Sequence, residues 1–296
     1  MKNFASLFIL TAAVCWGLIG LSTRTLSAIG LSSFQICAIR CILSGAGLSA
    51  FLGIFSPATL KIAPRDLWMF FGTGVCSIVF FNVCYFTTIE LTTLSAAAIL
   101  LYTAPIFVML MSALFFREKI TPQKLAALLL ALGGCGFVTG VFAGDAGITP
   151  IGILTGIGSG FGYALYSIFG RAALAKYSSL TVTTYTFIVA GVCALPFCGA
   201  AEIVRTAAAQ PSAILYILFL AVISTVVPYL LYTAGLRHTE PGKASVMASV
   251  EPVVASAVGI LVYHEPLTFS SAVGALLVLA SVVLLNLPIR RKETRS

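Results

Sequence analysis

Charged side chains are scarce in this sequence of 296 residues. Only 9% of the residues are Asp, Glu, Lys or Arg, whereas soluble domains carry roughly 25%. Apolar residues make up 59%, and the mean hydropathy is +1.07. These values exclude an ordinary soluble domain and predict an all-α integral membrane protein whose main partner is the lipid bilayer. The net charge of +8 does not indicate a nucleic-acid partner, because the basic residues sit in short connectors and form no stripe.

Histidine and catalytic motifs are also rare. The two histidines, His238 and His264, fall in loops on opposite sides of the predicted bundle and cannot form one site. Neither a G-x-x-x-x-G-K-[ST] phosphate loop nor an H-E-x-x-H zinc motif occurs. The eight cysteines lie in apolar segments, without the spacing of a metal site or a disulfide framework. We therefore predict no cofactor, no metal and no enzymatic activity.

What the sequence has is a series of apolar runs of about 20 residues, the length that a helix needs to cross ~30 Å of hydrocarbon. The first run resembles a signal peptide, but it lacks a small-residue cleavage site and further runs follow it, so we interpret it as a membrane helix. The predicted spans are 4–23, 33–54, 67–88, 93–115, 123–142, 150–170, 180–200, 212–235, 242–262 and 269–288.

The basic residues predict the orientation of these ten spans. With a cytoplasmic N-terminus, 14 basic residues fall in cytoplasmic loops or termini and two, Arg24 and Arg205, fall on the other side. This asymmetry satisfies the positive-inside rule. We therefore expect a multi-pass protein of the cell (inner) membrane with both termini in the cytoplasm. The remaining basic residue, Arg40, lies within the second span.

The chain is internally duplicated. One offset, that from Arg24 to Arg171, aligns the two halves of the chain without a gap, and the two predicted domains are residues 1–144 and 145–296. Because each holds five spans, an odd number, the second enters the membrane from the opposite side. Inverted repeats are typical of secondary transporters. The matched positions are 24/171, 28/175, 32/179, 64/211, 77/224, 85/232, 92/239, 97/244, 105/252, 118/265 and 121/268.

Several motifs carry a resemblance to a known family. They are CWGLIG (15–20), YFTTIELTTLSAAAILLYTAPIF (85–107) and REKIT (117–121), and in the second half YTAGLRHTEPGKASVMASVEPVV (232–254) and HEPLT (264–268). With these motifs the chain resembles the drug/metabolite transporter superfamily, in the ten-helix branch built from two EamA-like domains. The resemblance covers nearly the whole chain. It implies a central cavity lined by the first, third, fourth, sixth, eighth and ninth helices, and a small organic cargo such as an amino acid.

Two prolines and one carboxylate stand out within the predicted spans. Pro105 and Pro252 are repeat mates at the middle of the fourth and ninth spans, where each is expected to kink its helix. Glu251 precedes Pro252, and its repeat mate is Ala104. A carboxylate is unfavourable in hydrocarbon by about 2.5 kcal/mol or more, so Glu251 is expected to face the bundle interior. Three roles remain open for it: coupling transport to protons, binding a cationic group of the substrate, or anchoring neighbouring helices by a hydrogen bond.

Further polar groups are candidates for the cavity. Arg40 is a second intramembrane charge, for which snorkelling toward the outer interface is a simpler interpretation than pairing with Glu251. Large amphipathic side chains suit a pocket for a small organic molecule, although tyrosines also fill cores and interfacial belts. The predicted substrate-binding residues are Trp16, Asn82, Tyr85, Tyr102, Tyr163, Tyr229, Tyr232, Ser249 and Glu251, and Tyr166 is a further aromatic residue on these helices.

The leading hypothesis is a secondary transporter that exports a small organic metabolite by alternating access, either coupled to protons through Glu251 or without coupling. The alternative is a membrane binding or assembly protein that transports nothing. Large soluble domains or long loops would favour that alternative, and the sequence has neither. The sequence makes no prediction of substrate identity or oligomeric state.

Overall fold

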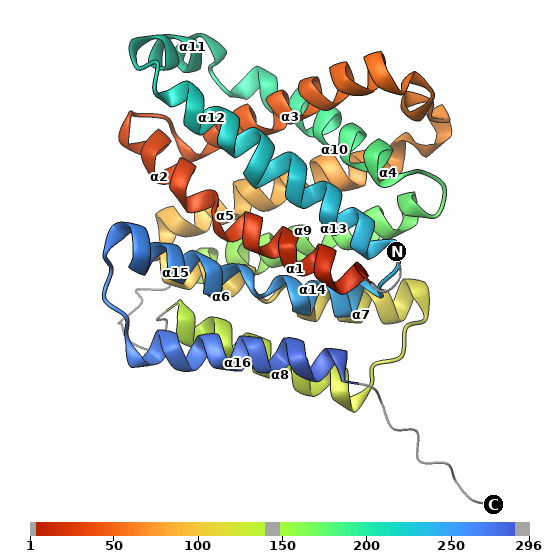
Figure 1. Ribbon diagram of the computed structural model, residues 1–296, viewed down its shortest axis with the longest axis vertical. Coiled ribbons are helices and arrows are strands. Elements are labelled where there is room, and N and C mark those ends of the chain that lie inside the picture. Colours follow the sequence, from red (N-terminus) through yellow and green to blue (C-terminus); the bar gives the residue numbers. More distant parts are fainter. Residues whose placement is uncertain (1–3, 140–148, 288–296) are drawn as a thin grey trace, which may run out of the picture.

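The regular structure is helical throughout residues 4–139 and 149–287, which are the part of the chain that this computed structural model describes (Figure 1). Nine helical segments there are long and apolar enough to span a membrane, and a tenth, Pro122–Val138, is a shorter apolar helix. The predicted fold class, an all-α membrane protein of ten spans in two repeats, is confirmed.

The first repeat contains five spans, of which three have internal irregularities. The first span is broken at Leu18, the third passes through a π-helical segment, and the fourth is broken at Tyr102 and Thr103. Its elements are α1 (Ala5–Gly17), α2 (Ile19–Ala28), α3 (Ser33–Phe55), η2 (Pro57–Leu60), η3 (Pro64–Asp66), α4 (Leu67–Phe71), η4 (Gly72–Val79), α5 (Phe80–Leu91), α6 (Leu94–Leu101), α7 (Ala104–Phe116) and α8 (Pro122–Val138).

The second repeat matches this pattern in its eighth and ninth spans. A π-helical segment recurs in the eighth span, and the ninth is broken at Ser249 and Val250. Its elements are α9 (Pro150–Leu174), α10 (Ser179–Ala194), η6 (Leu195–Phe197), α11 (Ala200–Ala209), α12 (Ala213–Ala221), η7 (Val222–Val226), α13 (Val227–Leu236), α14 (Pro241–Ala248), α15 (Glu251–Tyr263) and α16 (Phe269–Asn286). Helix α11 was not predicted, because it is short and carries Glu202 and Arg205.

The connectors after the fourth and ninth spans fold alike. Arg117 and His264 end their helices in the left-handed region, with φ of 56° and 55°. Three residues after Glu118 and Glu265, the hydroxyl groups of Thr121 and Thr268 accept hydrogen bonds from the backbone three residues further on. The duplication therefore extends from the sequence to backbone conformation.

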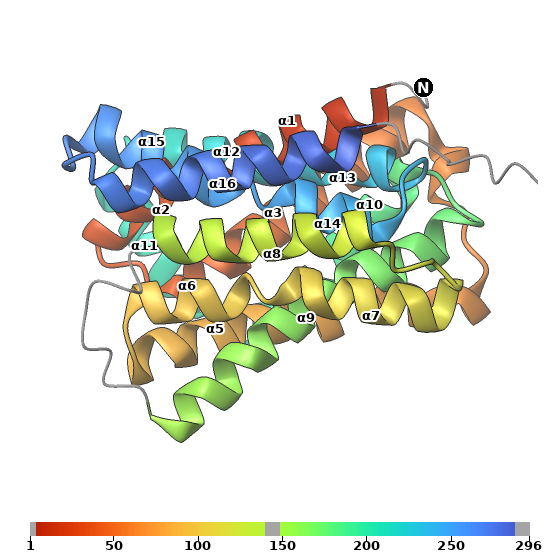
Figure 2. The ribbon, with the colours of Figure 1, turned by 90° about the horizontal axis from the view of Figure 1, so that it is seen from below.

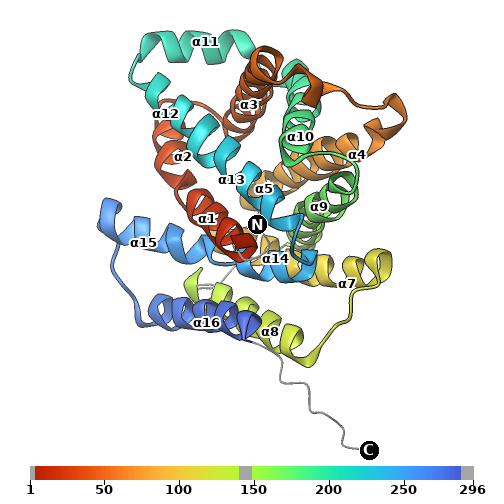
Figure 3. The same cartoon turned by 45° about the vertical axis from the view of Figure 1, so that its right-hand side comes forward.

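The spans are arranged so that the repeats interlock. Helix α9 packs along α5, α6 and α7 (Figure 2), and in the inverted counterpart α1 packs along α13, α14 and α15. Helices α8 and α16 form a pair on one side of the molecule, and α3, α10 and α12 lie on the other (Figure 3). The centre is surrounded by the remaining spans, which are the first, third, fourth, sixth, eighth and ninth.

The α8–α16 pair depends on two glycines. A methyl group built on Gly274 would lie 2.6 Å from the carbonyl oxygen of Gly134 and 2.6 Å from the backbone nitrogen of Val138. Only glycine permits this approach of the two backbones, and small residues at such contacts are typical of membrane helices.

We expect Gly274→Ala to lower the unfolding free energy by about 1–3 kcal/mol, because the added methyl group overpacks the α8–α16 contact. The midpoint of thermal unfolding in detergent measures this change. Gly133→Ala is the matched control on the same helix pair, because nothing lies within 4 Å of a methyl group built there. Equal midpoints for the two variants would contradict the prediction.

Candidate functional site

A cavity of about 770 Å³ lies among the central spans, and the first turns of α3, in the second span, also line it. It reaches the surface where α2 ends and α3 begins, at the exposed residues Ser27, Ala28 and Ser33. It extends inward to Tyr102 and Glu251, at the two helix breaks. The lining residues are Trp16, Ile19, Thr23, Arg24, Ser27, Ala28, Ser33, Ile36, Cys37, Arg40, Phe81, Asn82, Tyr85, Phe86, Ile89, Leu101, Tyr102, Tyr163, Tyr229 and Glu251.

The two helix breaks have a common local cause. Pro105 and Pro252 each occupy the second position of the helix that follows the break. A proline is tolerated in a first helical turn, where its missing N–H has no intrahelical partner, but it cannot continue the helix that precedes it. Glu251 is the first residue of α15, and a carboxylate is favoured at such a helix N-terminus. Its repeat mate Ala104 begins α7 without a charge.

Arg40 faces the same cavity from α3. Arg40 is 7% exposed, and its Nη2 donates to the Tyr229 hydroxyl at 3.5 Å. Its Nε has no hydrogen-bond partner among the residues that the structure describes. The expected snorkelling is therefore wrong: the cavity and Tyr229 provide a polar environment within the bundle, so the side chain does not extend to the interface.

Glu251 and Arg40 attract each other electrostatically across the cavity but do not form an ion pair. No hydrogen bond of the described residues reaches the Glu251 carboxylate. Arg24, the other charged residue of the lining, is paired with Glu265, so the inner part of the cavity presents one anion, Glu251, and one cation, Arg40, each with unused hydrogen-bonding capacity. Buried polar groups in this condition are expected to be completed by water or by a ligand.

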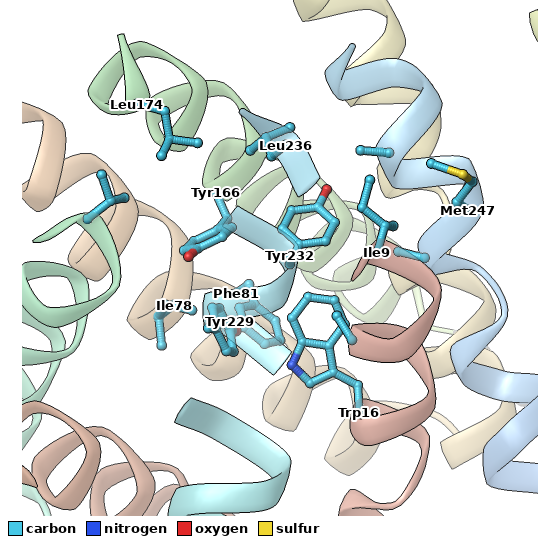
Figure 4. Packing of buried hydrophobic residues seen from close by; sticks show 14 of the residues in the cluster. Ile9, Trp16, Ile78, Phe81, Tyr166, Leu174, Tyr229, Tyr232, Leu236 and Met247 are labelled. Atoms are coloured by element: carbon cyan, nitrogen blue, oxygen red, sulfur yellow. The ribbon is translucent and has the colours of Figure 1, made fainter. Parts of the chain in front are cut away.

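Aromatic residues pack together at the inner end of the cavity, where Trp16 and Tyr229 belong to its lining (Figure 4). The Trp16 ring lies 5.2 Å from that of Tyr229 and 5.3 Å from that of Tyr232, and Tyr166 lies 5.0 Å from Tyr229. These edge-on and tilted contacts are the preferred geometries of aromatic pairs. Ile9, Leu236 and Met247 belong to the same buried cluster as these rings (Figure 4). In this conformation the closed side is therefore densely packed, while the opposite side is open.

Most of the predicted site residues lie together. Trp16, Asn82, Tyr85, Tyr102, Tyr163, Tyr229, Glu251 and Arg40 all line the cavity. Tyr232 and Ser249 do not: Tyr232 is 3% exposed, with its hydroxyl 2.8 Å from that of Ser167, and Ser249 is 4% exposed within the ninth-span break. Tyr166 belongs to the aromatic cluster.

Residues of α2 and of the first turns of α3 also line the cavity and were missed. Among them are Thr23, Arg24, Ser33 and Cys37. The break at Leu18, between Gly17 and Gly20, separates α2 from α1. The only sequence signal for this wall was Arg24, a basic residue on the side of the bundle that is otherwise poor in basic residues.

Ten spans in two inverted repeats around a central cavity are the architecture of a membrane transporter. Residues 3–140 and 150–287 each match the EamA-like transporter family. The protein therefore belongs to this family, which the resemblance of its motifs had indicated.

Relatives and a solved structure agree with this assignment. The chain is 28% identical to an uncharacterized inner membrane transporter of Salmonella typhimurium, YicL, over 96% of this chain and 95% of the relative. It is also 28% identical to an uncharacterized transporter of Archaeoglobus fulgidus, over 90% and 93% of the two chains. A solved crystal structure that is 19% identical matches the fold with a TM-score of 0.79 over 97% of each chain.

Proposed function

We propose that this protein is a secondary transporter that exports small zwitterionic metabolites, amino acids above all, across the inner membrane by alternating access. The observation that carries the proposal is the cavity with an unpaired cation and an unpaired anion at its inner part. A secondary transporter requires a solute site near the middle of the membrane that opens to one side at a time.

The charges of the cavity favour a zwitterion. An arginine guanidinium is well suited to a carboxylate, and a carboxylate such as Glu251 is suited to an ammonium group. The aromatic residues Trp16, Tyr163 and Tyr229 lie on the same lining and offer an apolar surface to the body of the solute. A purely cationic or anionic solute would leave one of the two charges unmatched, which is unfavourable in a buried site.

The distribution of basic residues supports the direction of opening. Lys61, Arg117, Lys119, Lys176 and Arg237 lie in connectors at the end of the bundle where the first span begins, and that end is cytoplasmic by the positive-inside rule. The cavity reaches the surface at the other end. The conformation is then outward-open, which is the state in which an exporter releases its solute.

Binding can be tested with purified protein before the cargo is known. At a concentration of ten times the Kd, a bound solute stabilises a folded protein by about 1.4 kcal/mol. We expect α-amino acids to raise the thermal unfolding midpoint, while the matching amines and carboxylic acids raise it less. Sucrose at equal osmolarity is the control for non-specific effects.

Flux separates the transporter from the alternative of a binding or assembly protein. A solute that raises the unfolding midpoint is loaded into proteoliposomes, and its counterflow exchange is measured. Exchange above that of empty liposomes supports transport. Stabilisation without exchange would favour a binding protein, and no stabilisation by any zwitterion would contradict the proposed substrate class.

A further inference from the structure

Arg24 and Arg171 are repeat mates, yet they make different contacts. The Arg24 Nη1 donates to the Glu265 carboxylate at 2.8 Å, at the end of the bundle where the cavity opens. The Arg171 Nη1 instead donates to the carbonyl oxygens of Leu236 and Arg237, at 2.7 and 2.9 Å. Arg24 thus joins the first span to the connector after the ninth, whereas Arg171 joins the sixth span to the end of the eighth.

The residues equivalent to the partners of one arginine are also present beside the other arginine, but they do not bond to it in this conformation. The repeat mate of Glu265 is Glu118, which Arg171 attracts electrostatically without forming an ion pair. The repeat mates of Leu236 and Arg237 are Ile89 and Glu90, which lie in the last turn of α5. No arginine in the described part of the chain donates to their carbonyls.

The two connector glutamates are held by equivalent backbone. The N–H of Glu118 donates to the carbonyl of Ser112 at 3.3 Å, and that of Glu265 donates to the carbonyl of Gly259 at 3.1 Å. Each glutamate follows a residue in the left-handed region, Arg117 or His264. Glu118 is therefore placed to receive an arginine in the same way as Glu265.

Glu118 is incompletely neutralised in this conformation. Its closest cation is Lys124, with the Nζ 4.0 Å from its Oε2, and the same ammonium forms an ion pair with Glu240. Burial, and next the charge of Glu240, raise the pKa of the Glu118 carboxyl above its ordinary value. This carboxylate would thus gain from an arginine partner that it does not have while its end of the bundle is closed.

The walls of the cavity show where Arg24 could move. Arg24 on α2 and Ile89 on α5 both line the open cavity. At the closed end, the corresponding contact of Arg171 with the end of α13 holds the sixth and eighth spans together. The last carbonyls of a helix lack intrahelical partners and are natural acceptors for a guanidinium. A move of Arg24 to the carbonyls of Ile89 and Glu90 would bring α2 and α5 together across the opening.

We propose that Arg24 and Arg171 are reciprocal switches of the transport cycle. Each bonds the connector glutamate, Glu265 or Glu118, while its own end of the bundle is open. Each moves to the last carbonyls of the neighbouring helix, Ile89–Glu90 or Leu236–Arg237, when that end closes. This inference rests on alternating access, because inverted repeats that exchange conformations also exchange these contacts.

The energetics of the Arg24 contact suit a reversible switch. The side chains of Arg24 and Glu265 are 52% and 47% exposed, and the guanidinium lies 4.3 Å from the centre of the Tyr263 ring. Exposed ion pairs and exposed cation–π contacts are individually weak. Such a contact biases the equilibrium between two conformations without locking either one.

The rate at which a thiol reagent labels Cys37 measures how much of the protein is in the outward-open conformation. Cys37 lines the cavity about one helical turn from the start of α3, so the outward-open cavity is its route to solvent. The experiment uses the full-length protein in nanodiscs and measures the labelling rate with a charged methanethiosulfonate reagent. Cys37→Ser provides the background from the other cysteines. We expect Glu265→Gln to slow Cys37 labelling about fivefold, the ratio that one exposed ion pair can shift.

Three further variants separate a switch from a static ion pair. Glu118→Gln should not slow labelling, and combined with Glu265→Gln it should restore the rate toward that of the wild type. Arg24→Gln removes the partner of both states, so it should slow labelling less than Glu265→Gln does. If Glu265→Gln does not fold, Glu265→Asp replaces it with the same expected direction.

Three results would overturn the switch: equal slowing by Glu118→Gln and Glu265→Gln, equal slowing by Arg24→Gln and Glu265→Gln, and no response of Cys37 labelling to Glu265→Gln. A merely loosened fold would speed labelling, which is the opposite sign. Counterflow exchange with unresponsive Cys37 labelling would leave the proposed transport intact and remove the switch. If the variants changed Cys37 labelling as expected but no solute were exchanged, the switch would stand and the proposed transport would be removed.

Discussion

Replacing Glu251 by glutamine is expected to abolish solute flux driven by a pH gradient and to leave counterflow exchange in place at solute concentrations high enough to offset the weaker binding. The carboxylate lines the cavity, begins α15 and has no hydrogen-bond partner among the described residues. It can therefore take up or release a proton as the cavity changes its exposure, which an amide of nearly the same shape cannot do. Ionisable residues inside membrane spans commonly serve as proton relays. The measurement is flux into proteoliposomes with and without an imposed pH gradient.

Glu202→Gln is the matched control for this substitution. It removes a carboxylate from α11, where Glu202 accepts a hydrogen bond from Gln35 outside the cavity. Gradient-driven flux should persist in this variant. If flux driven by the gradient persisted equally in Glu251→Gln, the coupling role would be refuted, and Glu251 would keep only a role in binding or anchoring.

The fold was predictable because the sequence features that indicate it occur many times along the chain. The length of the apolar runs defines the spans, and the matched pairs at one offset, such as Pro105 and Pro252, define the repeat. Helix α11 was missed because ten residues with two charges, Glu202 and Arg205, carry no membrane-span signal. The π-helical segments Gly72–Val79 and Val222–Val226 were missed because their composition does not differ from that of an α-helical span.

The candidate site was predictable to the level of helices but not of helix faces. Tyr229 and Tyr232 are three residues apart on α13, yet Tyr229 lines the cavity and Tyr232 bonds Ser167 in the core. An aromatic residue fits either environment, so only the rotation of the helix decides between them. The snorkelling expected of Arg40 did not take its partner into account, because the contact with Tyr229 depends on how α3 and α13 are placed in the bundle, which the sequence does not encode locally.

Exchanging Arg40 for methionine is expected to weaken amino acid binding about 100-fold, because a hydrogen-bonded charge pair with the substrate carboxylate is lost. Methionine occupies a similar length and stays apolar, so it leaves the α3 backbone in place. Arg40→Lys keeps the charge but loses the forked geometry, and about a tenfold loss is expected. The measurement is the concentration dependence of the thermal unfolding midpoint, supported by the KM of counterflow exchange.

The sharper form of this prediction compares each solute with analogues that lack one charge. In Arg40→Met, an amino acid and its decarboxylated amine should bind with nearly equal affinity, because the variant has lost the group that recognises the carboxylate. In Glu251→Gln, an amino acid and the matching carboxylic acid without its amino group should become similar in the same way. Arg40→Met therefore loses recognition of the carboxylate and Glu251→Gln loses recognition of the amino group. This is expected if Arg40 and Glu251 bind a zwitterion between them in one cavity. Loss of both discriminations in either single variant would instead mean that the two charges act only on the shape of the cavity.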